Sequence, residues 1–182
     1  MAFWRNRWDG KVKVVSEEDT LVFLELEGKR VGGVYADGKL HGTAWKDWLG
    51  KVELLTGREG GVVGDWNAHS EAWDSGNKED SRGRTMADWV VGSGFEIADG
   101  GPWIWERVRR GRLERSKIDL FLSRGAKRWE KAESAKLGSD HWAIVVEIDW
   151  GESQRNAVKE VVDWRMLEDM VEEVVEEKKE DA

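Results

Sequence analysis

Three short polar motifs, each attached to an apolar segment, constrain the fold of this 182-residue chain more than any other feature. Gly64-Asp65-Trp66-Asn67 follows the apolar pair Val62-Val63, and Ser139-Asp140-His141 precedes the apolar run Ala143–Val146. Between them, Ser116-Lys117-Ile118-Asp119 leads into a further apolar stretch. Short apolar runs bounded by turn residues are typical of buried strands. The sequence therefore predicts that three strand ends bring their polar side chains to one pocket.

Composition excludes several classes of protein. A chain of this length with 40% hydrophobic residues can bury a core, as one domain or as one domain with an appendage. No window approaches the ~20 consecutive apolar residues of a membrane span, and the first residues lack the apolar segment of a signal peptide. We therefore expect an intracellular protein without a membrane partner. The chain contains no cysteine, so any metal would be bound by oxygen or imidazole ligands.

Charge is distributed unevenly along the chain, whose net charge is −8. Residues 152–182 contain eleven acids and five bases, whereas residues 105–131 contain ten Arg or Lys and four acids. Such a basic run is more often a solvated loop than a DNA track, but it allows the body of the protein to approach phosphates. The residues expected to contact nucleic acid are Arg109, Arg110, Arg112, Arg115 and Lys117.

The chain alternates between predicted strands and helices, which favours an α/β or α+β fold. Apolar positions spaced by three or four residues predict a helix from about Thr43, the expected N-cap, to Leu55. A second helix is expected from about Gly83 to Val91, before a glycine-rich stop. Residues 151–182 show an apolar stripe on an acidic background and predict an amphipathic helix. It would pack on the domain or fray at its end, or else dock a partner or connect two domains. The expected strands are Lys11–Val15, Leu21–Leu26, Arg30–Ala36, Gly61–Val63, Ile118–Leu122 and Ala143–Ile148.

The residue types in the motifs suit phosphodiester hydrolysis. That reaction needs a cation that neutralises charge on the phosphoryl oxygens, a base for the attacking water and help for the leaving oxygen. Mg²⁺ prefers oxygen ligands, so Asp140, Asp65 and the amide of Asn67 suit it, and Mn²⁺ is an alternative. His141 is suited to contact phosphate, while Asp119 can accept the other ring N–H.

Each of these residues also has a structural explanation. Asp65-Trp66-Asn67 alone is as compatible with an Asx turn as with a catalytic site. Tyr35, the only tyrosine, taken by itself is more typical of a core position than of a site. Asp119 favours function, because a carboxylate within an apolar strand is costly to bury without a partner.

In their order along the chain, the motifs resemble those of the endonuclease/exonuclease/phosphatase superfamily. Gly64-Asp65-Trp66-Asn67 is similar to the superfamily's Gly-Asp-Phe-Asn motif and Ser116-Lys117-Ile118-Asp119 to its Ser-x-Ile-Asp motif. Ser139-Asp140-His141 is similar to its terminal Ser-Asp-His motif. Tyr35 matches the position of the active-site tyrosine, which lies beside the scissile phosphate. The added Ala68-His69 looks most like the branch of non-LTR retrotransposon endonucleases.

The resemblance implies a fold and a role for each residue. The fold would be two packed β-sheets flanked by helices, a four-layer α/β/β/α sandwich. Asp65 would orient or activate the attacking water, Asn67 would bind phosphate or stabilise the transition state, and Asp140 would help to hold the metal. His141 would contact the scissile phosphate, with its ring oriented by Asp119.

The resemblance also implies partners and a location. DNA would be the substrate, and a reverse-transcriptase region or a second chain would dock through the C-terminal helix. The protein would be nuclear if it is part of a eukaryotic retroelement.

We expect the domain to be incomplete. In this superfamily the first half of the domain supplies an Asn and then a Gln-Glu pair, whose Glu is a principal metal ligand. Neither is found here, and the only glutamine is Gln154, beyond the last motif. We therefore expect residues 1–150 to form a partial, C-terminal portion of the domain, followed by the acidic helix over residues 151–182. A site with one carboxylate fewer is expected to bind Mg²⁺ weakly and to have weak or no activity.

Three functions remain compatible with the sequence. The first is a Mg²⁺-dependent DNA endonuclease of retrotransposon type. The second is a catalytically silent remnant that binds nucleic acid. The third is a phosphatase of a small phosphorylated substrate, for which no specific motif is visible. Kinship of fold alone does not separate them.

Overall fold

The computed structural model describes residues 10–97, 103–124, 128–131, 139–142 and 144–147. Helices and strands alternate along these segments, so the mixed α/β class expected from the sequence is confirmed. The helices of the described segments are α1 (Gly42–Thr56) and α2 (Ser81–Ser93). Their strands are β1 (Val12–Glu18), β2 (Leu21–Leu26), β3 (Lys29–Tyr35), β4 (Gly60–Asp65), β5 (Glu96–Ile97), β6 (Trp105–Arg109), β7 (Arg112–Ser116), β8 (Asp119–Ser123), β9 (Arg128–Lys131) and β10 (Ile144–Glu147).

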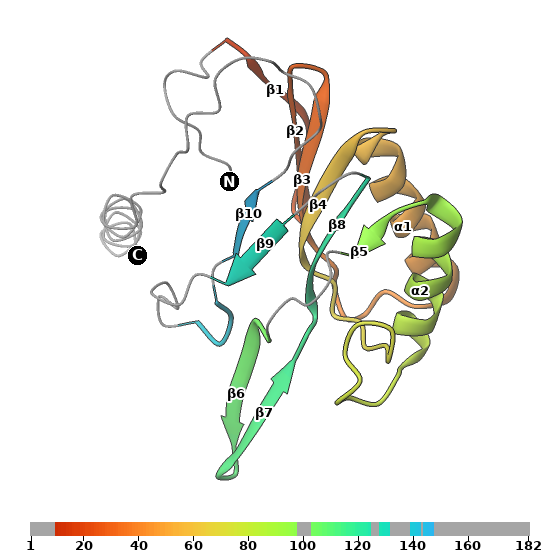
Figure 1. Cartoon of the computed structure of the whole chain (residues 1–182). Helices are drawn as coiled ribbons and strands as arrows, with labels where there is room; N and C mark the ends of the chain where they lie inside the picture. Colours follow the sequence, from red (N-terminus) through yellow and green to blue (C-terminus); the bar gives the residue numbers. More distant parts are fainter. Residues whose placement is uncertain (1–9, 98–102, 125–127, 132–138, 143, 148–182) are drawn as a thin grey trace, which may run out of the picture.

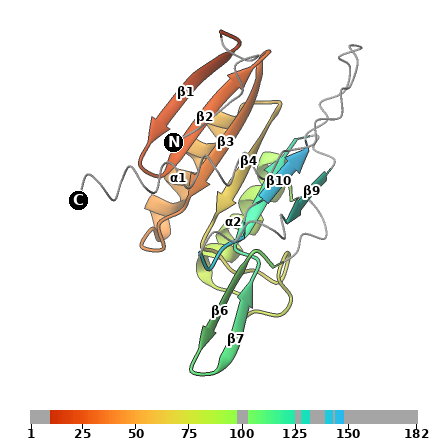
Figure 2. The same ribbon diagram turned by 90° about the vertical axis from the view of Figure 1, so that its left-hand side faces the viewer.

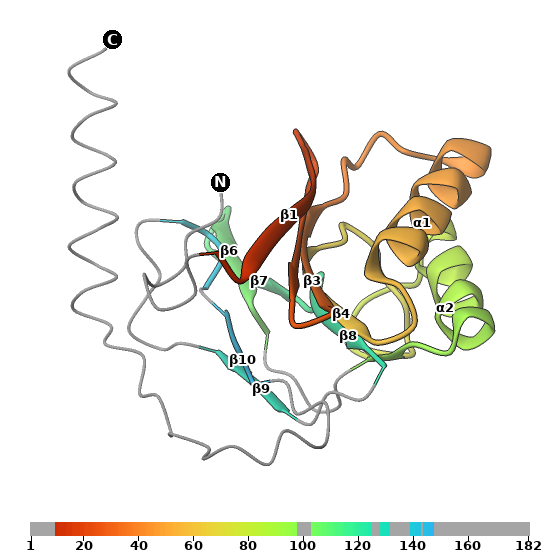
Figure 3. The same cartoon turned by 90° about the horizontal axis from the view of Figure 1, so that it is seen from above.

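A six-stranded mixed sheet forms the centre of this structure, with the strand order β1-β2-β3-β4-β8-β5. Strands β3 and β4 are parallel, whereas the other neighbouring pairs are antiparallel. Helix α1 makes the crossover from β3 to β4 that a parallel pair requires. Figure 1 shows α1 and α2 on one face of the sheet and the two-stranded sheet β9–β10 on the other. Seen from above in Figure 3, the same three layers lie side by side.

The two stacked sheets of the expected sandwich are therefore confirmed. Both described helices cover the same face, so the helical layer expected outside the second sheet is not formed by the described segments. The acidic helix expected over residues 151–182 lies outside the described residues, and the incompleteness of the domain stays a prediction. Neither α1 nor α2 is long and apolar enough to cross a membrane.

The main core lies between the helices and the six-stranded sheet. Trp45, Leu49 and Val52 come from one side of α1, as their spacing predicts, and Met86 and Val90 come from α2. The sheet contributes alternate residues of four neighbouring strands, as expected for a strand with one face buried. These residues are Leu21, Phe23, Val34, Val62, Leu120 and Leu122.

The helix starts differ from those expected. α1 begins one residue before Thr43, and its N-cap is His41, whose side chain makes no capping hydrogen bond, so the prediction of Thr43 as N-cap is wrong. α2 begins two residues before Gly83, because the Asp80 side chain accepts a hydrogen bond from the Gly83 N–H at 2.6 Å. It ends at Ser93, two residues beyond the expected Val91, and of the glycine-rich stop only Gly94 acts as the C-cap, in the left-handed conformation.

The basic run does not form the solvated loop that its composition favours. Strands β6 and β7 pair as an antiparallel hairpin, in which Arg110 (φ 51°) and Gly111 (φ 74°) form a two-residue turn. The hairpin extends away from the rest of the molecule in Figures 1 and 2. An isolated β-bridge between Trp105 and His141 connects the base of the hairpin to Ser139-Asp140-His141, the third motif along the chain. The basic side chains are therefore carried on a defined arm.

Candidate active site

Three polar residues lie in a row across the central strands. In the sheet register Tyr35 of β3 is the partner of Asp65 of β4, which is in turn the partner of Asp119 of β8. Partners in register point to the same face of a sheet. Because Val34 and Leu120 belong to the core under the helices, the row faces the opposite side, toward β9–β10. Tyr35 is 52% exposed, so its interpretation as a core residue is wrong.

The turn after β4 fixes the carboxylate of Asp65. Asn67 donates its backbone N–H to Asp65 Oδ1 at 2.8 Å and its side-chain Nδ2 to Asp65 Oδ2 at 3.1 Å. The same Nδ2 donates to the carbonyl of Ala36 at 3.1 Å, which joins the ends of β3 and β4. Gly64 allows the close approach of these strands, since a Cβ there would lie 1.9 Å from the carbonyl oxygen of Val34. The Asx turn considered from the sequence is present, and it positions the half-buried carboxylate of Asp65.

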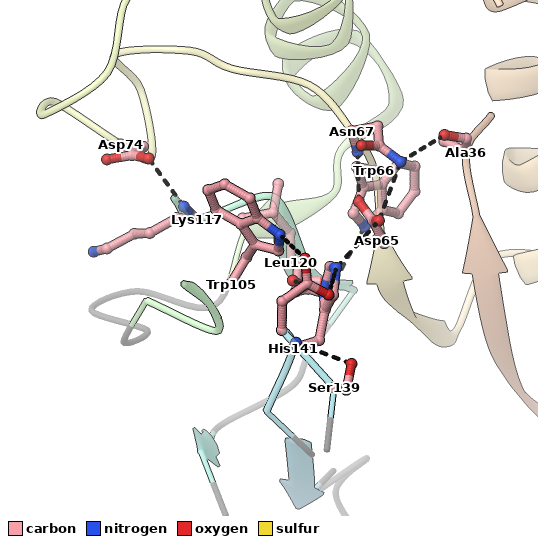
Figure 4. Close-up of polar contacts among 12 residues, drawn as sticks. Ala36, Asp65, Trp66, Asn67, Asp74, Trp105, Lys117, Leu120, Ser139 and His141 are labelled. Atoms are coloured by element: carbon pink, nitrogen blue, oxygen red, sulfur yellow. Dashed lines mark hydrogen bonds and ion pairs between the residues drawn. The ribbon is translucent and has the colours of Figure 1, made fainter. Parts of the chain in front are cut away.

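The third motif brings a histidine to this row. His141 Nδ1 lies 2.9 Å from Asp119 Oδ2, the contact expected from the sequence. An ionised carboxylate only accepts hydrogen bonds, so Nδ1 carries the proton. The opposite ring nitrogen, Nε2, lies 4.0 Å from Asp65 Oδ2 and 3.9 Å from Asp140 Oδ1. Figure 4 shows Asp65 and Asn67 at the end of β4, with His141 approaching from the facing loop.

Two residues of the hairpin strand β6 donate hydrogen bonds to Asp140. Its Oδ2 accepts a hydrogen bond from the indole Nε1 of Trp105 at 3.0 Å, and its side chain is 48% exposed. Its backbone carbonyl accepts the N–H of Glu106 at 3.0 Å. Trp105 was not among the residues expected at the site, because no spacing in the sequence connects the start of β6 with the third motif.

The electrostatics differ among the three titrating groups. Burial, and secondarily the neighbouring charge of Asp119, raise the pKa of Asp65 to about 6, against the opposing effect of the Asn67 hydrogen bond. The hydrogen bond to Asp119 raises the pKa of His141. The Trp105 hydrogen bond lowers the pKa of Asp140. A half-buried carboxylate with a pKa of about 6 therefore lies beside an imidazole whose pKa is raised.

The donor set partly fits a hard cation. The carboxylates of Asp65 and Asp140 both approach the Nε2 side of His141, and such oxygens are the ligands that Mg²⁺ prefers. Asn67 uses its Nδ2 in two hydrogen bonds, so only its Oδ1 is suited to a cation. No group of three or more His, Cys, Asp or Glu side chains with metal-binding spacing occurs within the described segments. A cation here would keep several of its water ligands.

The residues expected to contact nucleic acid lie on or next to the hairpin. Arg109 and Arg112 are cross-strand partners beside the turn residue Arg110, and all three are exposed. Arg115 and Lys117 lie at the base, with their charged groups 5.7 and 5.9 Å from the ring centroid of Trp103. None of the five joins the row of Tyr35, Asp65 and Asp119.

The fold and this arrangement of residues define a member of the endonuclease/exonuclease/phosphatase superfamily. The family model described as endonuclease-reverse transcriptase matches residues 41–145, which is more than half of the chain. The chain belongs to this family, and thus to a superfamily of phosphodiester hydrolases and phosphatases. No curated protein matches its sequence.

Solved structures share the fold. The endonuclease domain of TRAS1, a telomere-specific non-LTR retrotransposon, matches with a TM-score of 0.65 and 18% identity, over 78% of this chain and 70% of that domain. The 3'-5' exonuclease NExo from Neisseria meningitidis matches with a TM-score of 0.54 and 18% identity, over 76% of this chain and 71% of that one. The 3' phosphatase NExo from Neisseria, bound to a product DNA hairpin, matches with a TM-score of 0.54 and 16% identity, over 76% and 70%.

Proposed function

We propose that this chain carries a Mg²⁺-dependent DNA endonuclease site of the retrotransposon type. The observation that carries the proposal is the approach of Asp65 and Asp140 to the same nitrogen of His141, within 4.0 Å, beside the row of Tyr35 and Asp119. These residues come from four separate parts of the sequence. The family of the chain and its likeness to the TRAS1 endonuclease domain support the same reaction class.

The roles follow from position and charge. Asp65, with a pKa of about 6, is ionised at neutral pH and still basic enough to orient and deprotonate a water molecule. His141, whose pKa is raised by Asp119, favours the cationic form that attracts a phosphate oxygen. Asn67 supplies an amide, and Tyr35 an exposed side chain with a hydroxyl, at the same end of the sheet.

Asp140 and Asp65 would hold the cation, with Asn67 Oδ1 as a further ligand. When bound, Mg²⁺ or Mn²⁺ would neutralise charge on the phosphoryl oxygens. The Trp105 hydrogen bond lowers the pKa of Asp140 and fixes its Oδ2, while Oδ1 lies 3.9 Å from His141 Nε2.

DNA would be positioned by the hairpin. Arg109, Arg110 and Arg112 are exposed on an arm that extends from the body, so they are available to contact phosphates outside the site row. Contacts of this kind add affinity without sequence information, and they weaken with salt.

Nicking of supercoiled plasmid tests the proposal. Wild type is expected to nick in Mg²⁺ or Mn²⁺ but not in EDTA, and Asp65→Asn and His141→Ala are expected to lose at least about a hundredfold in rate. Asp47→Asn and His41→Ala, which change exposed residues of the same types outside the site row, are matched controls. Nicking that survives both site substitutions would refute the proposed site.

A catalytically silent remnant is the second candidate. The observation that favours it is that no group of three or more His, Cys, Asp or Glu side chains within the described segments is arranged to hold a metal ion. A folded protein that binds duplex DNA in a salt-sensitive way, but does not nick it in Mg²⁺ or Mn²⁺, would select this function.

A further inference from the structure

A buried arginine connects the helical layer to the site. Arg82, in the first turn of α2, is only 4% exposed, and its guanidinium lies 4.3 Å from the ring centroid of Trp45. Burial lowers the pKa of Arg82, which reflects the cost of removing this charge from water. A buried charge persists only when its hydrogen bonds compensate for that cost. The acceptors of those hydrogen bonds therefore indicate which segments the guanidinium holds together.

Both hydrogen bonds of the guanidinium end on main-chain carbonyls next to site residues. Nη1 donates to the carbonyl of Asp37 at 2.6 Å, and Nη2 donates to the carbonyl of Trp66 at 3.0 Å. Asp37 lies two residues after Tyr35, and Trp66 lies between Asp65 and Asn67. One planar group thus joins the two segments that leave β3 and β4.

Asn67 makes hydrogen bonds to both of these segments. Its backbone is in the left-handed region, with φ 46°, which is uncommon for a residue other than glycine. Its Nδ2 bridges Ala36 on one segment and Asp65 on the other. The separation of the segments therefore decides whether Asn67 can make both bonds at once.

The helix start that carries Arg82 is itself fixed. A Cβ at Gly83 would lie 1.8 Å from the carbonyl oxygen of His69, so the first turn of α2 packs directly on the chain that follows Asn67. The Trp45 indole donates to the Arg82 carbonyl at 3.2 Å. The guanidinium is held by rigid neighbours, as a positioning group requires.

We propose that Arg82 is a positioning residue for the hydrolytic site, whose planar fork holds the ends of β3 and β4 at the separation that Asn67 and Tyr35 need. The proposal rests on the proposed function for its catalytic consequence. A lysine is a poor substitute, because its ammonium is a point charge without two donors in a fixed fork.

Nicking kinetics of Arg82→Met and Arg82→Lys test the catalytic part. Arg82→Met is expected to lower kcat by at least about tenfold with KM for DNA within about twofold, because misplaced groups weaken the reacting geometry rather than DNA binding. Arg82→Lys is expected to recover only part of kcat. Arg84→Met is the matched control, since Arg84 lies on the same turn but is exposed and pairs with Glu79.

The folded state of each variant is verified first by near-UV circular dichroism and thermal melting. Wild-type kcat in folded Arg82→Met, or a loss confined to KM, would overturn the proposal. If Arg82→Met does not fold, Arg82→Lys decides the matter, and full kcat in that variant would overturn it.

Hydrogen exchange tests the positioning without relying on activity. The amides of Ala36, Trp66 and Asn67 are hydrogen-bonded in wild type, each at 2.8 Å. In folded Arg82 variants these amides are expected to exchange at least about tenfold faster, while amides of the β1–β2 pair keep their rates. Unchanged exchange at all three would overturn the proposal even if wild type nicks DNA. Faster exchange with an inactive wild type would support the positioning role and reject only the proposed function.

Discussion

The ionised form of Asp65 lowers the free energy of unfolding. A rise of its pKa from 3.8 to about 6 means that the folded state binds the proton more tightly than the unfolded state does. The free energy of unfolding therefore falls as pH rises from about 4 to 6, by about 3 kcal/mol in all. Its side chain is 14% exposed, so solvent screening is small. Such a cost is typical of a group kept for chemistry.

Asp65→Asn is accordingly expected to stabilise the protein while it removes activity. In EDTA at pH 7.5 the gain should be about 1–3 kcal/mol, less than the full amount because an amide offers one acceptor oxygen to the two Asn67 donors. At pH 4 the gain should vanish. Denaturant unfolding at the two pH values measures this, with Asp47→Asn as control. An equal effect at both pH values would contradict the assignment.

The charge of His141 is predicted to depend on Asp119. Because Asp119 raises the pKa of His141, the pair contributes stability that is present below the ordinary pKa of histidine and is lost as pH rises through the raised value. Asp119→Asn is expected to lower the pKa of His141. Proton NMR titration of the ring measures this, and the other two histidines of the chain provide reference resonances. An unchanged titration would show that another group sets the charge.

The motif residues could be predicted from the sequence because each lies next to the apolar run that becomes its strand. Trp105 and Arg82 could not, since Trp105 contacts a residue 35 positions away and Arg82 one 45 positions away. Indole groups occur in cores and at surfaces, and guanidinium groups lie mostly at surfaces, so the residue types alone do not indicate these two contacts.

At the level of elements, the hairpin β6–β7 contains so many charged residues that its strands lack the apolar pattern of a buried strand. Arg107 and Glu114 are cross-strand partners, as are Val108 and Leu113, so the two strands pair without a buried apolar face. For this reason the composition favours a loop rather than a strand. The exposed Arg-Gly turn, which requires positive φ, was the local signal for a hairpin.

Removal of the hairpin charges is expected to weaken DNA binding without loss of the fold. A triple alanine substitution of Arg109, Arg110 and Arg112 should reduce the slope of log K against log salt by about 2–3. Fluorescence anisotropy with a labelled duplex at several salt concentrations measures this. The control changes exposed Lys13, Lys46 and Arg58 on other elements. Equal losses in both triples would mean that net charge, rather than the arm, binds DNA.

A second element-level prediction concerns the base of the hairpin. Ser116 Oγ, which is buried, lies 3.1 Å from His69 Nδ1 and donates to Asp74 Oδ2 at 3.3 Å. Ser116→Ala removes a donor from a buried carboxylate and should cost about 1–3 kcal/mol of unfolding free energy. Denaturant unfolding measures it, with exposed Ser81→Ala as control. A neutral result would show that Asp74 is satisfied by Asn77 and the Lys117 amide alone.

For the whole molecule, the sequence predicted the class and the stacked sheets but not the order of strands. The apolar runs identify which segments are buried, yet β8 inserts between β4 and β5, which come much earlier in the chain. That insertion places Asp119 beside Asp65. Pairing of strands so distant in sequence is decided by side chains of all three strands together, and periodicity within one strand does not contain this information.

Metal binding should couple the separate parts of the site to global stability. Asp65 from β4 and Asp140 from the third motif would share one cation, so Mg²⁺ should stabilise the fold that brings them together. With a Kd of about 1 mM, 10 mM Mg²⁺ would add about 1.4 kcal/mol to the free energy of unfolding, or roughly 3–6 °C in Tm.

Asp65→Asn and Asp140→Asn should each abolish this shift in Tm, although Asp65→Asn raises Tm in EDTA. The control Asp47→Asn should keep the shift. Differential scanning calorimetry with and without Mg²⁺ measures the shift. A shift that survives both substitutions would place the cation elsewhere, and no shift in wild type up to 10 mM would mean that these two carboxylates do not form a cation site.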